Sequence, residues 1–126
     1  MRNLIKTFLV MLMLSFSHAA IAGDLEDGFA AAQKGDFATA LRLWKPLAEQ
    51  GYAKAQYNLG LMYAIGQGVA QDYVKAHTWF NITAIDGDAE LIKNRDDVAK
   101  KMTSAQIEKA QEAASRCIKQ NFKNCD

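Results

Sequence analysis

The side chains in this sequence that could do chemistry are His77, the cysteines Cys117 and Cys125, and carboxylate pairs such as Asp96 and Asp97. A general base needs a nucleophile or a substrate group within hydrogen-bond reach, and the sequence neighbours of His77 offer neither. The carboxylate pairs have the spacing of solvated helix faces. No Ser, His and Asp set stands out, so the sequence predicts a protein that is not an enzyme. A small hydrolase is the least favoured of the three functions considered for this sequence.

The segment Gly66-Gln67-Gly68-Val69 has some likeness to a phosphate-binding loop. Such a loop also needs a lysine and a hydroxyl residue, and it follows a strand. Both residues are missing here, and residues 53–65 before the segment have a helical pattern. A tight turn between two helices explains the glycines better. We therefore expect no cofactor at this segment, and no metal elsewhere.

Cys117 and Cys125 both lie in the last ten residues of the 126-residue chain. A metal site needs more ligands than two cysteines, and a catalytic thiol needs a base, whereas His77 is far away in the sequence. In an oxidising compartment such a pair can persist as a disulfide. We therefore expect a structural disulfide that ties the end of the last helix to the tail folded back over it.

Residues 1–22 have the layout of a secretory signal peptide. A positively charged start is followed by the uncharged, mostly apolar residues 7–16 and by the small-x-small pattern Ala20-Ile21-Ala22. The apolar run is too short to span a bilayer as a stable helix. We expect cleavage before Gly23, a periplasmic or secreted mature protein of residues 23–126, and no stable membrane insertion after cleavage. The alternative is an uncleaved N-terminal anchor.

The charge of the chain is close to balanced. Its formal net charge is +1, and removal of residues 1–22 takes away two basic residues and no acid. Neither form has the basic excess with which proteins bind nucleic acid or anionic membranes. We therefore expect no nucleic-acid partner.

A shift of the sequence by 36 residues aligns two similar stretches. The aligned pairs match aspartate with aspartate, aromatic with aromatic, and small residue with small residue. They are Asp36/Asp72, Phe37/Tyr73, Ala40/Ala76, Ala48/Ala84, Gly51/Gly87 and Ala53/Ala89. A period of this length suits two helices and two turns per repeat.

Capping residues and glycines indicate where helices begin and end. Asp36, Asp72 and Asp88 precede helical patterns as N-caps do, and Thr103 with Gln106 has the spacing of a capping box. The glycines that suit turns of positive φ are Gly35, Gly51, Gly66, Gly68 and Gly87. No stretch alternates long enough to predict a strand. The expected helices cover residues 24–34, 37–50, 53–65, 73–86, 89–102 and 104–121.

The residues of these helices resemble a known family. We find a resemblance to the signature of Sel1-like repeats, relatives of the tetratricopeptide repeats, in Leu59-Gly60-x-x-Tyr63-x-x-Gly66-x-Gly68-Val69-x-x-Asp72-x-x-Lys75-Ala76-x-x-Trp79. A second resemblance, to the repeat that usually precedes this signature, lies in Gly35-Asp36-Phe37-x-x-Ala40-x-x-x-Trp44-x-Pro46-Leu47-Ala48-x-x-Gly51. Residues 99–110 resemble the closing helix of such arrays. Together with the export signal, the resemblance identifies an exported bacterial member of the family.

The resemblance implies an all-α fold, a short α-solenoid of stacked antiparallel helix pairs with a C-terminal capping helix. It implies repeats at about residues 28–51 and 52–87 and a degenerate third unit with the cap at 88–126. It also implies a non-catalytic protein–protein interaction module, an adaptor or scaffold in the bacterial envelope. An immunity-type inhibitor of a toxin or hydrolase needs only the same shaped surface and is the second choice. The fold alone does not identify the protein partner.

One face of the predicted helix 53–65 is a candidate partner-binding surface. Its residues share helical spacing and are Lys54, Asn58, Leu61 and Ile65. Exposed leucine and isoleucine beside lysine and asparagine suit an apolar anchor with a polar rim. The alternative is that Leu61 and Ile65 pack on the preceding helix through Leu25 or Phe29.

Overall fold

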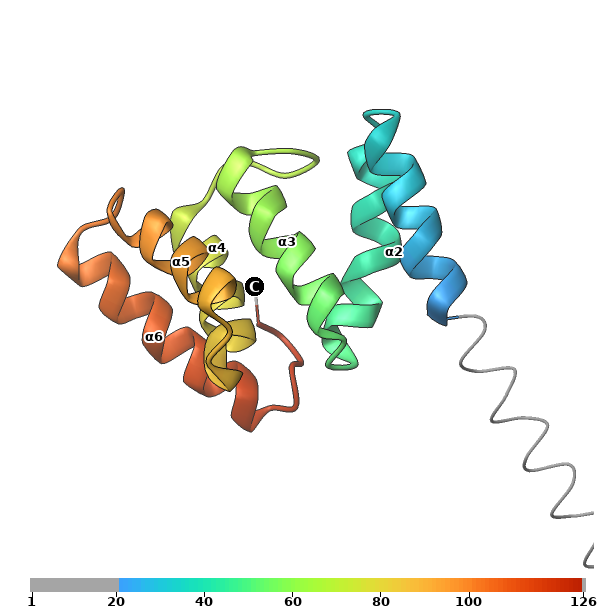
Figure 1. The fold of residues 1–126 in the computed structure, drawn as a ribbon. Coiled ribbons are helices and arrows are strands. Elements are labelled where there is room, and N and C mark those ends of the chain that lie inside the picture. The colour runs from blue at the N-terminus through green and yellow to red at the C-terminus, as the bar shows by residue number, and fades with distance from the viewer. Residues whose placement is uncertain (1–20, 126) are drawn as a thin grey trace, which may run out of the picture.

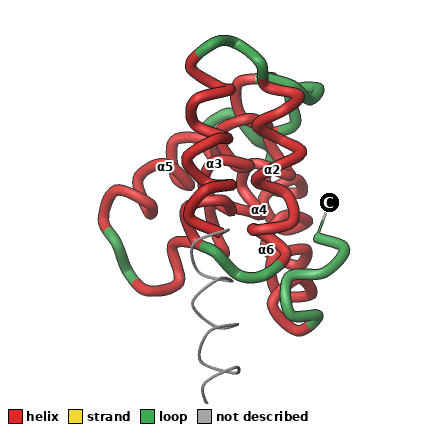
Figure 2. Tube along the Cα trace, turned by 90° about the vertical axis from the view of Figure 1, so that its right-hand side faces the viewer, coloured by secondary structure: helices red, strands yellow, loops and turns green. Residues whose placement is uncertain are grey.

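The computed structural model describes residues 21–125, which form helices and turns with no strand among them (Figures 1 and 2). An N-terminal helix covers residues 21–33 of the described chain. The elements that follow are α2 (Phe37–Glu49), α3 (Ala53–Ile65), α4 (Tyr73–Thr83), the 3₁₀ turn η1 (Ala84–Asp86), α5 (Ala89–Ala99) and α6 (Ser104–Lys119). The predicted all-α fold is confirmed. Of the predicted signal peptide, residues 1–20 lie outside the described part.

The helices stack in sequence order as a short α-solenoid (Figure 1). The N-terminal helix pairs with α2, and α3 pairs with α4, while α2 also contacts α3. The third unit is looser, because α5 and α6 both pack on α4 more closely than on each other. The central helix α4 therefore holds the second repeat and the last two helices together.

The helices begin where the capping residues predict. Asp36 Oδ1 accepts a hydrogen bond from the Thr39 N–H at 3.1 Å, and Asp72 Oδ1 accepts one from the Lys75 N–H at 3.0 Å. Thr103 forms the predicted capping box with the residue three positions later. Each bond satisfies a backbone donor that the first helical turn leaves free.

The predicted helix 73–86 is divided in the structure. Its α-helical part ends at Thr83, and a 3₁₀ turn continues to Asp86. The Thr83 hydroxyl donates to the Phe80 carbonyl at 3.1 Å, a local bond of the kind that competes with regular helix geometry. Gly87 then leaves the helix with φ of 83°, so this chain reversal depends on a glycine as predicted.

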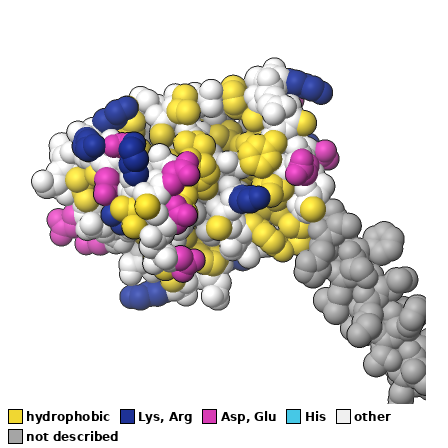
Figure 3. All heavy atoms as spheres, viewed as in Figure 1, with side chains coloured by type: hydrophobic (Ala, Val, Ile, Leu, Met, Phe, Trp, Pro, Cys, Tyr) yellow, Lys and Arg dark blue, Asp and Glu magenta, His cyan; other side chains and the backbone are white. Residues whose placement is uncertain are grey.

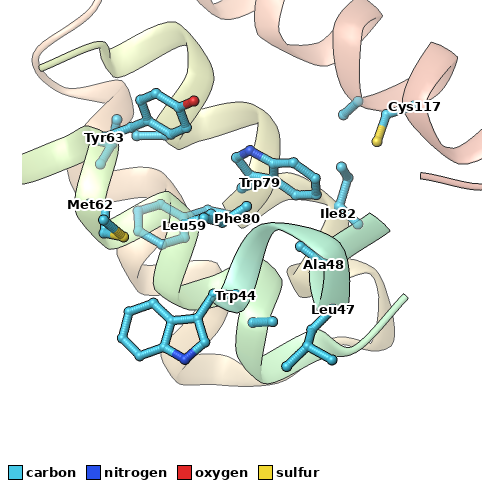
Figure 4. Close-up of a cluster of buried hydrophobic side chains, with 14 of the residues drawn as sticks. Trp44, Leu47, Ala48, Leu59, Met62, Tyr63, Trp79, Phe80, Ile82 and Cys117 are labelled. Carbon is cyan, nitrogen blue, oxygen red and sulfur yellow. The ribbon is translucent and has the colours of Figure 1, made fainter. Parts of the chain in front are cut away.

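Side chains from α2, α3, α4 and α6 meet in one core (Figure 4). Trp79 and Phe80 of α4 are its largest fully buried residues, and Leu59 of α3 packs beside them. The labelled residues around them are Trp44, Leu47, Ala48, Met62, Tyr63, Ile82 and Cys117. Because a repeat buries its apolar face only against its neighbours, this shared core makes the units one folding body.

After α6 the chain turns back toward the α2–α3 turn (Figure 1). Cys117 and Cys125 form a disulfide whose Cα atoms lie 4.9 Å apart. The backbone turns through Asn121 and Phe122, which have φ of 52° and 65°. The Phe122 ring lies so near Gly51 that a Cβ atom there would be 3.1 Å from it. The tail thus closes over the core, held by a covalent bond and an aromatic contact.

Candidate functional site

The outward face of α3 carries exposed apolar surface. Ile65, near its end, is 57% exposed, and Lys54 at its beginning is also exposed. Leu61 between them is half-buried and packs partly on the core. In the view of Figure 3, hydrophobic side chains gather over α3 and the N-terminal helix, whereas charged side chains are interspersed over α5 and α6. We call Lys54, Leu61 and Ile65 the α3 strip.

Asn58 does not belong to this exposed strip. Only 6% of the residue is accessible, and its Nδ2 has no hydrogen-bond partner among the described residues. Because α3 packs against both α2 and α4, most of its circumference is covered. The prediction that all four residues share one exposed face is therefore corrected to a narrower strip.

Leu25 and Phe29 of the N-terminal helix are engaged with α2. The Trp44 Nε1–H donates to the Leu25 carbonyl at 3.2 Å, and the Phe29 and Trp44 rings meet edge-on at 5.2 Å between centroids. Gly28 lies directly against the same indole. These contacts with Trp44 pair the N-terminal helix with α2. Ile65 stays exposed and is not covered by Leu25 or Phe29.

A tyrosine of α3, not predicted from the sequence, joins the strip to α5. The Tyr57 hydroxyl accepts a hydrogen bond from Asn94 Nδ2 at 3.2 Å, and its ring packs on Phe80 with centroids 5.6 Å apart. Burial, followed by the nearby Glu90 carboxylate, raises the pKa of Tyr57. The hydrogen bond links α3 to α5, and the ring contact links α3 to α4. The pairing joins residues 37 positions apart, so no local pattern indicates it.

The residues considered for acid–base chemistry have other surroundings. Asp97 accepts hydrogen bonds from Lys93 at 2.6 Å and Lys100 at 2.8 Å. The bond from Lys100, then that from Lys93, lowers the pKa of Asp97 to about 2, so this carboxylate stays ionised. His77 is 3% exposed, and burial, followed by the charge of Arg95, lowers its pKa.

The described residues contain no group of three or more His, Cys, Asp or Glu side chains placed to hold a metal ion. Between residues 21 and 125, no helix has the length and apolarity needed to cross a membrane. The disulfide joining Cys117 and Cys125 is consistent with an oxidising compartment outside the cytoplasm.

The class of protein defined by stacked helix pairs is a tetratricopeptide-like α-solenoid. The Sel1 repeat model matches residues 19–52 and 53–88, more than half of the chain. The chain belongs to the Sel1 repeat family. The first match begins at residue 19 and so includes the N-terminal helix in the first repeat, for which the resemblance implied a start near residue 28.

A solved structure supports the same fold. The chain is similar to a protective antigen present in uropathogenic Escherichia coli strains, whose crystal structure displays an SLR fold. The two share 28% sequence identity and superpose with a TM-score of 0.70. The match covers 83% of this chain and 24% of that one, so this chain spans about a quarter of that protein. No curated protein matches the chain.

Proposed function

We propose that this protein is a non-catalytic adaptor of the bacterial envelope that binds a protein partner through the α3 strip. Sel1 repeats are generally protein-interaction modules. The observation that carries the choice of surface is Ile65, 57% exposed on the helix at the middle of the stack. A large aliphatic side chain facing solvent beside Leu61 offers an apolar anchor, and Lys54 supplies a charged rim.

The shape of the stack supports the same face. The N-terminal helix, α3 and α5 all lie toward the viewer in Figure 1, so α3 is flanked by one helix on each side. The Tyr57–Asn94 hydrogen bond fixes α5, and the contacts of Trp44 fix the N-terminal helix to α2. A partner segment lying on α3 would meet a surface that is already rigid, which lowers the entropic cost of binding.

The envelope location rests on residues 1–22 and on the disulfide. A signal-like N-terminus and a bonded cysteine pair are both typical of exported proteins. Cell fractionation followed by N-terminal sequencing tests it. We expect the protein outside the cytoplasm with Gly23 as its first residue. A cytoplasmic protein that begins at Met1 would contradict export.

Capture of the partner tests the proposed function. The mature 23–126 protein is crosslinked in envelope extract, next to the variants Ile65→Glu and Ile85→Glu. Ile85 in η1 is 65% exposed, so both charged substitutions are placed on exposed isoleucines. We expect one protein captured by the native bait and by Ile85→Glu but lost with Ile65→Glu. If folded Ile65→Glu captures the same protein equally well, the α3 strip is not the binding surface.

A further inference from the structure

A cleft with several charged lining residues lies between α4, α6 and the tail. Its volume is about 320 Å³, at the lower end of the range of ligand pockets. The charged and polar residues that line it are Asp72, Lys75, Thr78, Lys109, Arg116 and Asn124, and Cys125 also lines it. Because α4 lies between α3 and α6, this cleft is separate from the α3 strip.

The lining of the cleft carries an excess of positive charge. Lys75, Lys109 and Arg116 face one acid, Asp72. In the described part of the chain none of these three cations forms an ion pair with a carboxylate. The Asp72 carboxylate is already used, since it accepts from the Lys75 backbone N–H as the N-cap of α4, where the helix dipole offsets its charge.

The three cations that line the cleft are carried by helices α4 and α6. The Lys75 ammonium lies 5.2 Å from the centroid of the buried Tyr63 ring, a cation–π contact that restrains its position. Lys109 and Arg116 are seven residues apart on α6 and share the helix face that also presents Ala113 to the cleft.

The tail forms the remaining wall. Asn124 and Cys125 line this cleft and also a smaller one against α2 and α4, so the tail lies between α2 and α6. The Cys117–Cys125 disulfide joins this wall to α6. The cleft is therefore completed by the same covalent bond that closes the tail.

We propose that this cleft binds a carboxylate of an acidic peptide segment, either a glutamate or aspartate side chain or a chain terminus. A guanidinium offers paired donors that match a carboxylate, and the two ammonium groups add charge at short range. This proposal rests on the proposed function in one respect: it takes the ligand to be part of a protein partner. It gives the module a second contact, on the side of the stack away from the α3 strip.

Titration calorimetry with short peptides tests the site directly. The probes are a pentapeptide with two central glutamates and blocked ends, the same peptide with glutamines, and the glutamine peptide with a free C-terminal carboxylate. We expect the mature, disulfide-bonded protein to bind a carboxylate peptide at low salt and not the blocked glutamine peptide. Comparison of the glutamate and free-terminus peptides identifies the source of the carboxylate. Binding should weaken as salt is raised.

Matched variants separate the cleft from general electrostatic attraction. The double variant Lys109→Gln/Arg116→Gln should bind the peptide about tenfold more weakly. The control Lys119→Gln/Lys123→Gln removes the same charge from exposed residues outside the cleft and should change affinity less than about twofold. Ile65→Glu should bind the peptide normally, which distinguishes this site from the α3 strip.

Three results would overturn the proposal. The first is equal loss of affinity in both double variants, which indicates only net charge. The second is binding of inorganic phosphate as tightly as of the carboxylate peptides, which indicates a general anion site. The third is no binding of either carboxylate peptide at millimolar concentration to protein with an intact disulfide.

Discussion

The backbone of Gly60 on α3 lies against the ring of Phe80 on α4, so that a Cβ atom at Gly60 would be 2.5 Å from Phe80 Cε1. Both residues are buried. The absence of a side chain at this point lets the two helices of the repeat approach closely, with the aromatic ring filling the space. The glycine of the Leu59-Gly60 signature is thus a packing requirement of the helix pair.

Replacement of Gly60 by alanine should therefore destabilise the protein. Alanine favours a helix over glycine by about 0.5–1 kcal/mol, but the overpacked methyl group costs about 1–3 kcal/mol. We expect a net loss of roughly 1–2 kcal/mol in the free energy of unfolding, measured by urea denaturation. Gly23→Ala is the control, since no atom lies within 4 Å of its Cβ position. A Gly60→Ala variant as stable as the native protein would show that α3 and α4 do not pack in this way.

The disulfide should contribute measurably to stability. It closes a loop between cysteines eight positions apart, for which loop-closure entropy gives about 2–3 kcal/mol. The loop that it closes contains Phe122, whose φ of 65° lies in the left-handed region that bulky residues rarely adopt. We expect Cys125→Ser to lower the melting temperature by roughly 10 °C. A reductant should lower that of the native protein similarly and leave the variant unchanged, and an unaltered midpoint in both would contradict a structural role.

His77 should make stability dependent on pH. Burial, then the charge of Arg95, lowers its pKa below the ordinary value of 6.5, so the folded protein keeps it neutral where the unfolded chain takes up a proton. Its contribution is therefore complete above pH 6.5 and is lost as pH falls toward the lowered pKa. We expect the free energy of unfolding to fall as the pH drops below 6.5, by at most about 1.4 kcal/mol per pH unit.

The variant His77→Gln tests the assignment, because His77 is the only histidine of residues 23–126. Urea denaturation of the mature variant should show a flatter pH profile below pH 6.5. Asp36 and Asp97 have lowered pKa values and titrate at more acidic pH, so they do not obscure this window. An equally steep profile in the variant would assign the dependence to another group.

The helix starts could be predicted because local residues encode them. Asp36, Asp72 and Thr103 cap helices with their own side chains, and each chain reversal with a predicted glycine has positive φ there. The division of the expected helix 73–86 at Thr83, where the hydroxyl donates to the Phe80 carbonyl, has no such signal in the sequence. The expected starts of α2 to α6 match the structure, whereas four of their expected ends run one to three residues too far.

The surface and the cleft were harder to predict because they depend on tertiary packing. Asn58 has the helical spacing of the α3 strip, yet the neighbouring helices bury it. Lys75 of α4 and Arg116 of α6 line the same cleft although they are 41 positions apart in the sequence. No periodicity within one helix reveals either fact, since both depend on which elements lie side by side.

Photocrosslinking from position 65 tests whether a partner binds the α3 strip, because it records contact in the living cell at one residue. A photoreactive amino acid replaces Ile65 in one strain and Ile85, which is also exposed, in another. We expect a light-dependent crosslink to one protein from position 65 and none from position 85. Crosslinks to that protein from position 85 alone, or no crosslink from position 65 in folded, exported protein, would contradict binding through the α3 strip.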